Sequence, residues 1–168
     1  MTPRTRDVLA HLGACFAAPY RVLGAAAPAF SDDGAVVRAY EAARACGEVA
    51  LAIGDRLGQP PPPLAPVAAV LSSAVEQDPT GRLALYALAV VVGPRLLVSL
   101  RDARGEVDED AVGLLDHASD LIVGEIVAIR DLAVSRPDAP SGADRGAARA
   151  LAEALDGAGY AESLGPDR

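Results

Sequence analysis

The sequence contains no lysine, asparagine or tryptophan, and aromatic residues make up only 4% of its 168 residues. All 15 basic residues are arginines, and together with abundant alanine, glycine and proline this is typical of a GC-rich coding sequence. Individual arginines are therefore not interpreted as chosen over lysine for their planar geometry. With 51% hydrophobic residues and few aromatics, we expect a core of alanine, leucine and valine and closely packed helices.

Positive charge is also scarce, because 15 arginines face 23 acidic residues and the formal net charge is −8. A surface that binds phosphate groups needs the opposite sign of charge. Nucleic acids are therefore disfavoured as partners. Anionic membrane surfaces are disfavoured for the same reason.

Cysteine occurs only twice, at Cys15 and Cys46, and this spacing fits neither a metal motif nor a redox motif. Two buried thiols in a reducing compartment are the expected arrangement. Residues 1–29 imitate a signal peptide, but Asp7 and Arg21 interrupt the apolar run that such a signal needs. We therefore predict a cytoplasmic protein whose first residues form an ordinary amphipathic helix.

The sequence lacks the common motifs of catalytic, metal and phosphate-binding sites. The sequence has no Glu-x-x-His pair for a di-metal bundle, no glycine-rich phosphate loop and no nucleophile elbow. The acidic residues Glu41, Glu48 and Asp55 recur every seven residues, opposite an apolar seam, and are expected to face water. His117 is expected on a solvent side as well. We predict neither a cofactor nor a metal site.

From Leu83 to Val92 no residue carries a charge, and the stretch has no polar face at any helical angle. A helix that is apolar all round must be surrounded by protein or lipid. Pro94 lacks the N–H that would continue the backbone hydrogen bonding, so the helix should kink there. We predict a central apolar helix over about 82–101, kinked at Gly93-Pro94.

A membrane span is the other interpretation of this stretch, because Leu83–Leu100 is near the lower length limit for crossing a bilayer. Pro94 and Arg95 lie in its middle, and the remaining predicted helices are amphipathic in the manner of soluble proteins. The pattern therefore favours a helix buried in protein, with no membrane partner.

Capping and turn residues predict further helices around the central one. The predicted fold is an all-α antiparallel bundle of five to six helices, forming one domain over 1–157 with a flexible tail over 158–168. The proline-rich segment QPPPPLAP at 59–66 is expected to be a stiff connector. The expected outer helices cover about 3–17 with a further short piece at 20–27, then 33–57, 65–77, 108–133 and 143–155.

Two of these helices carry long, regular apolar seams with three- and four-residue spacing, over 33–57 and over 108–133. One central helix does not obviously cover both seams, so one of them is expected to serve a partner. We predict a non-enzymatic helical protein that acts by association, with itself as a homodimer or with another helical protein. The candidate association seam consists of Val112, Leu115, Ile122, Ile126 and Ile129.

Two charged residues stand among apolar neighbours, Arg95 in the central helix and Glu125 in the helix at 108–133. A desolvated charge is costly unless it is paired, so a direct Arg95–Glu125 ion pair is predicted. The alternative is that Arg95 reaches water from the kink and Glu125 flanks the seam.

A small-molecule binding protein is the second hypothesis. The kink could open an apolar pocket between helices, lined by Phe16, Tyr86, Arg95 and Leu97, for an anionic amphiphile. An enzyme whose site is assembled from scattered residues is a third hypothesis, and the sequence leaves it open.

Overall fold

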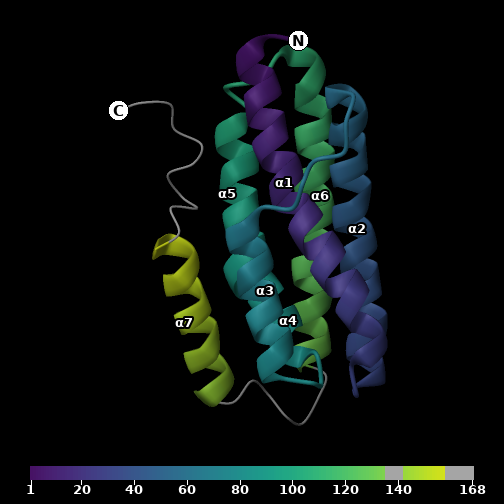
Figure 1. Ribbon diagram of the computed structural model, residues 1–168, viewed down its shortest axis with the longest axis vertical. Coiled ribbons are helices and arrows are strands. Elements are labelled where there is room, and N and C mark those ends of the chain that lie inside the picture. The colour runs from purple at the N-terminus through teal and green to yellow at the C-terminus, as the bar shows by residue number, and fades with distance from the viewer. Residues whose placement is uncertain (135–141, 158–168) are drawn as a thin grey trace.

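The structure is a computed structural model that describes residues 1–134 and 142–157. In this part of the chain six helices pack together, and consecutive helices run in opposite directions (Figure 1). The fourth helix in chain order is interrupted by a π-helical segment. The predicted all-α bundle is confirmed. The elements are α1 (Pro3–Ala26), the 3-10 turn η1 (Ala27–Ala29), α2 (Asp33–Leu57), α3 (Ala65–Gln77), α4 (Arg82–Ala87), the π-helical η2 (Leu88–Val92), α5 (Gly93–Ala103), α6 (Glu109–Val134) and α7 (Gly142–Gly157).

The predicted central helix is formed by α4, η2 and α5, and its apolar stretch is enclosed by protein. Ala87, Leu88, Ala89 and Val91 are each buried. The interruption is the π-helical η2, which directly precedes the predicted kink at Gly93-Pro94, and the N–H of Gly93 bonds the carbonyl of Leu88 and so widens this turn. A Cβ at Gly93 would lie 2.8 Å from the Leu88 oxygen and 2.9 Å from Ile126 Cδ1, so glycine permits α6 to approach here.

The ends of α2 follow directly from its sequence. The carboxylate of Asp32 accepts a hydrogen bond of 3.0 Å from the Ala35 N–H, which caps the first turn. Gly58 closes the helix in the left-handed conformation, with φ of 76°. The predicted bounds of this helix are therefore confirmed.

The first helix is longer than predicted. The sequence predicts a helix over about 3–17 and a separate short piece at 20–27, but α1 is continuous through Pro19 to Ala26. Pro19 is buried, and α1 packs along α2 on both sides of it, so tertiary packing offsets the missing backbone hydrogen bond. The sequence also predicts a flexible link over 137–142, and this link and the predicted tail over 158–168 lie outside the described residues, apart from Gly142, which begins α7.

The proline-rich connector (residues 59–64) crosses the outer side of α1 on its way from α2 to α3 (Figure 1). The Leu64 N–H donates to the Ala14 carbonyl at 2.7 Å, and Pro61 is buried. A Cβ at Gly13 would lie 2.9 Å from both Pro61 Cγ and Ile53 Cγ2. The connector is therefore packed against α1, and glycine in α1 makes room for it.

Two helices, Pro3–Ala29 and Arg82–Ala103, are long and apolar enough to cross a membrane by length and composition alone. Their most apolar windows are 61% and 67% buried inside the bundle. Core helices of soluble proteins meet the same criterion, so this observation is weak evidence for a membrane span.

Candidate association surface

The apolar seam predicted on α6 lies inside the bundle. Leu115, Ile122, Ile126 and Ile129 are buried against the chain's own helices, and only Val112 is partly exposed. The prediction that this seam serves a partner is therefore wrong for the folded chain. The reason is that the central helix covers the α6 seam while α1 covers the α2 seam, so neither seam is left over.

The predicted Arg95–Glu125 pair does not form. The Nε and Nη2 atoms of Arg95 donate to Oδ1 of Asp156 at 3.1 and 2.6 Å, and its Nη1 donates to the Val91 carbonyl at 3.0 Å. Glu125 instead lies 3.6 Å from Arg38 Nη1. The partner of Arg95 comes from α7, whose position against η2, α3 and α4 the sequence pattern did not indicate.

Glu125 occupies an unusual environment beside α2. Its Oε2 atom is buried and accepts no hydrogen bond. Burial raises the pKa of this carboxyl group, and the charges of Arg38 and Arg44 only partly oppose that effect. Burial, together with the nearby Glu125 charge, also raises the pKa of the Cys46 thiol to about 12. A thiol in that state is a poor nucleophile.

The predicted ligand pocket is not supported by these contacts. Phe16 is completely buried in the core, while Tyr86 and Leu97 are partly buried. Arg95, the intended cation for the ligand, is already hydrogen-bonded to α7 and to its own helix. None of these four residues lines the pocket that the structure shows elsewhere.

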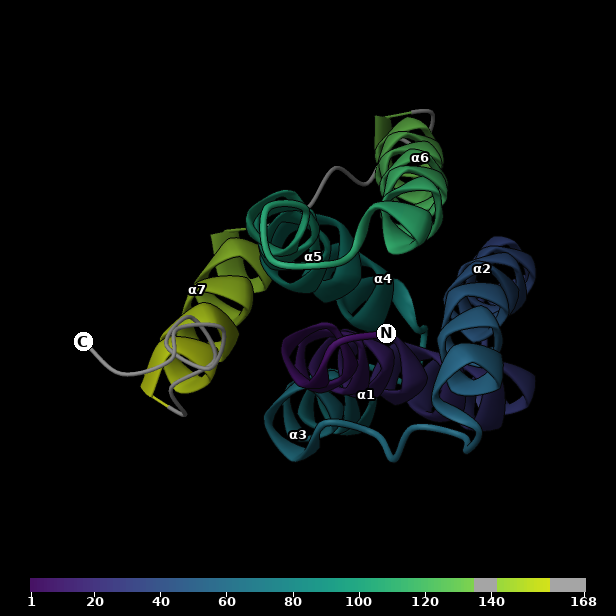
Figure 2. The ribbon, with the colours of Figure 1, turned by 90° about the horizontal axis from the view of Figure 1, so that it is seen from above.

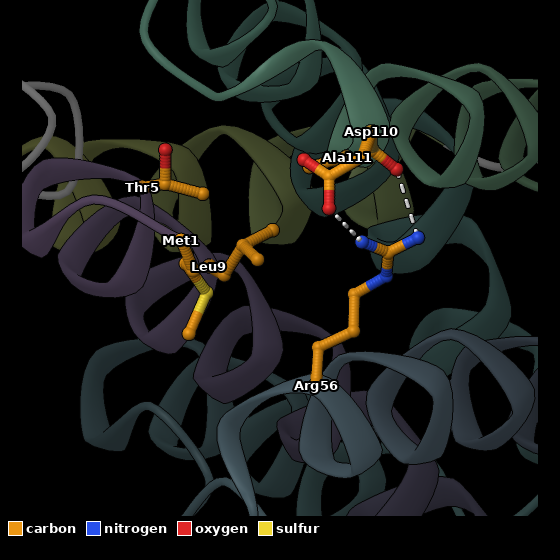
Figure 3. A pocket seen from close by; sticks show the side chains of 6 residues that line it. All are labelled: Met1, Thr5, Leu9, Arg56, Asp110 and Ala111. Atoms are coloured by element: carbon orange, nitrogen blue, oxygen red, sulfur yellow. Dashed lines mark hydrogen bonds and ion pairs between the residues drawn. The ribbon is translucent and has the colours of Figure 1, made fainter.

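That pocket has a volume of about 160 Å³ and lies between the beginnings of α1 and α6 and the end of α2 (Figure 3). Its polar atoms are already engaged. Arg56 Nη2 donates to the Asp110 carbonyl at 2.8 Å, and the Thr5 hydroxyl oxygen accepts from the Asp108 N–H at 2.9 Å. These hydrogen bonds connect the three helix ends, so the Arg56 guanidinium and the Thr5 hydroxyl are not available to a ligand. The lining residues are Met1, Thr5, Leu9, Arg56, Asp110 and Ala111.

Three polar pairs connect α2 and α6 along their length. The Arg56–Asp110 contact measures 3.4 Å, the Glu48–His117 contact 3.1 Å and the Arg38–Glu125 contact 3.6 Å. Their order shows that the two helices run antiparallel. His117 is exposed, as predicted, and it partners one of the acidic residues on the outer side of α2.

A second row of residues with helical spacing lies on the exposed face of α2, beside the acidic residues. Its positions are 37, 40, 44, 47 and 51, which repeat the three- and four-residue spacing of a helix-pairing seam. Three of them carry large apolar side chains, position 44 is an arginine and position 47 is a glycine. Val37, Tyr40 and Leu51 are 58%, 47% and 61% exposed. We call positions 37, 40, 44, 47 and 51 the outer stripe of α2.

Position 47 of the outer stripe is a glycine that another helix covers. A Cβ at Gly47 would lie 2.8 Å from Tyr20 Cδ2, so the ring of Tyr20 from α1 rests on it. Tyr20 is itself 45% exposed. Its ring therefore adds apolar surface beside position 47 of the outer stripe.

No model of a known protein family matches the chain, and neither a curated protein nor a solved structure is significantly similar to it. Function is therefore inferred from the chain's own surface. Among the described residues, no group of three or more His, Cys, Asp and Glu side chains could hold a metal ion.

Proposed function

We propose that this chain is a non-enzymatic protein that acts by association, as a homodimer. The supporting observation is the distribution of exposed apolar side chains. Of the eight large ones in the described part of the chain, three lie on the outer stripe of α2 and a fourth is the α1 residue that covers Gly47: Val37, Tyr40, Leu51 and Tyr20. Contiguous exposed apolar surface is typical of a protein interface, whereas single exposed residues are ordinary.

This proposal moves the contact from the inner seam of α6 to an outer face. It keeps the homodimer but assigns it to residues that the folded chain leaves exposed. We also propose a cytoplasmic location. The burial of both cysteines supports it, because thiols in the core suit a reducing compartment.

A small-molecule binding function receives less support. Its cation, Arg95, bonds Asp156, and the polar atoms of the pocket beside Arg56 bond within the chain. A thermal-shift screen with fatty acids and acyl-CoA compounds separates the two functions, because a ligand that binds the folded state raises its melting temperature. We expect no shift, and a concentration-dependent rise would favour the binding function.

The oligomeric state in solution tests the association function. We expect analytical ultracentrifugation of the full chain to give a dimer mass at micromolar concentration. A monomer mass across the micromolar range would overturn the proposal.

A further inference from the structure

We propose that the homodimer forms by antiparallel pairing of the outer stripes of α2 about a two-fold axis, an inference that rests on the proposed function. The axis would cross α2 beside Ala45 and Cys46, near the middle of the helix. Such an interface is isologous, because each copy contributes the same surface. In this interface the outer-stripe residues of the two copies meet, and the two α2 helices run in opposite directions.

The outer stripe is self-complementary about that point. Tyr40 and Leu51 lie equally far from it along α2, so each faces the other residue on the partner. Tyr20 rests on Gly47 between them and extends the apolar contact on both copies. The arrangement repeats on both sides of the axis, which gives two apolar clusters with a charged centre.

The centre carries one charge of each sign. Arg44 and Glu48 are 71% and 47% exposed and lie 3.6 Å apart within one copy. Antiparallel pairing brings Arg44 next to the partner's Glu48, and the same contact recurs across the axis. Opposite charges that meet in this way select the partner and its register. A second copy of the chain therefore matches the surface both in charge and in apolar residues.

Parallel pairing is disfavoured by the same residues. It would place Arg44 against the partner's Arg44 and Glu48 against the partner's Glu48, and like charges at close range are repulsive. It would also align the two helix dipoles, whereas antiparallel helices oppose them favourably. The polarity of the pair is therefore a consequence of the stripe's own sequence.

A charge-reversal cycle measured by analytical ultracentrifugation tests this geometry. We expect Arg44→Glu and Glu48→Arg each to weaken the homodimer by about tenfold or more, because each creates two like-charge contacts. Mixing the two variants should restore a heterodimer in which every contact is again between opposite charges. The double variant Arg44→Glu/Glu48→Arg should restore the homodimer, because both contacts across the axis are again between opposite charges. In a parallel pair each single variant would only exchange one like-charge contact for another, so the weakening by the single variants is what distinguishes the antiparallel arrangement.

Replacement of exposed apolar residues by glutamate provides a second test with its own control. Leu51→Glu should abolish the dimer, while Val127→Glu should leave it intact, since Val127 is a similarly exposed residue on α6. Thermal melts of every variant show whether it still folds. A wild-type monomer would overturn both the proposed function and this inference. A wild-type dimer that Leu51→Glu and Arg44→Glu leave unchanged would overturn only the inference.

Discussion

Gly58 and Gly81 share one backbone feature and differ in their surroundings. Both have positive φ, 76° and 81°, which disfavours any residue with a Cβ. At Gly58 an added Cβ would meet nothing within 4 Å. At Gly81 it would overlap the Phe30 ring, so this glycine is required for space as well as for conformation.

We therefore expect Gly81→Ala to be more destabilising than Gly58→Ala. The latter should cost about 1–2 kcal/mol from the left-handed backbone alone. The former should cost about 2–5 kcal/mol, because overlap with Phe30 adds to the same term. Urea unfolding of the two variants measures the difference. Equal losses would show that Phe30 moves aside without cost.

Glu125 should make stability depend on pH. Because the pKa of this buried carboxyl is raised above its ordinary value of 4.5, ionisation favours the unfolded chain. The penalty is absent at low pH and grows as the pH rises through and above that value. Glu125→Gln cannot ionise, so it should stabilise the protein at pH 7 and lose this advantage near pH 4.

Urea unfolding at both pH values measures the effect, with Glu76→Gln as a control. Glu76 is exposed on α3, so its substitution should change the free energy of unfolding little at either pH. An advantage of Glu125→Gln that is the same at pH 4 and pH 7 would mean that burial of the charge is not its cause.

The elements differ in how far their sequences determined them. The ends of α2 and α3 were predictable, because capping residues and turn residues act within a few positions of the chain. The course of α1 through Pro19 was not, because the compensation comes from packing against α2, which capping and turn residues do not encode. The pairing of Arg95 was missed for a similar reason, since Asp156 lies 61 positions away.

Arg95 bonds α7 to the rest of the bundle, and α7 also buries Ala148, Leu151 and Leu155 there. We expect Arg95→Met to loosen α7 selectively, because the guanidinium bonds to Asp156 are lost while the central helix stays apolar. Hydrogen exchange followed by mass spectrometry should show faster exchange across α7 and unchanged protection in α2.

Arg149→Met is the matched control, since Arg149 is 82% exposed and pairs with Glu153 on the same helix. Its substitution should leave exchange in α7 nearly unchanged. If both variants accelerate exchange equally, Arg95 has no special part in holding α7.

At the scale of the whole molecule, the bundle and its bent central helix followed from apolar periodicity, but the association surface did not. Val37, Tyr40 and Leu51 repeat with helical spacing, and that signal was in the sequence. Glu41, Glu48 and Asp55 occupy adjacent positions, so periodicity alone marks this side of α2 as an ordinary solvated face. The contribution of Tyr20 depends on packing between α1 and α2, which periodicity does not encode.

The enclosure of the central helix leads to a prediction about the intact protein. Because 67% of the most apolar window of Arg82–Ala103 is buried by other helices, detergent should not be needed to keep the chain in solution. After lysis without detergent, ultracentrifugation should leave the protein in the supernatant. Recovery only from the membrane pellet would contradict the arrangement of a core helix.

The proline-rich connector has a mechanical consequence. It passes over α1 on the side opposite the central helix (Figure 2), with Pro61 seated at Gly13 and Leu64 bonded to Ala14. A force applied to the first residue must either pull α1 lengthwise beneath the proline-rich connector or separate the connector from α1. Resistance to pulling at that end therefore depends on a crossing of the chain over itself, a property that heating or urea does not probe.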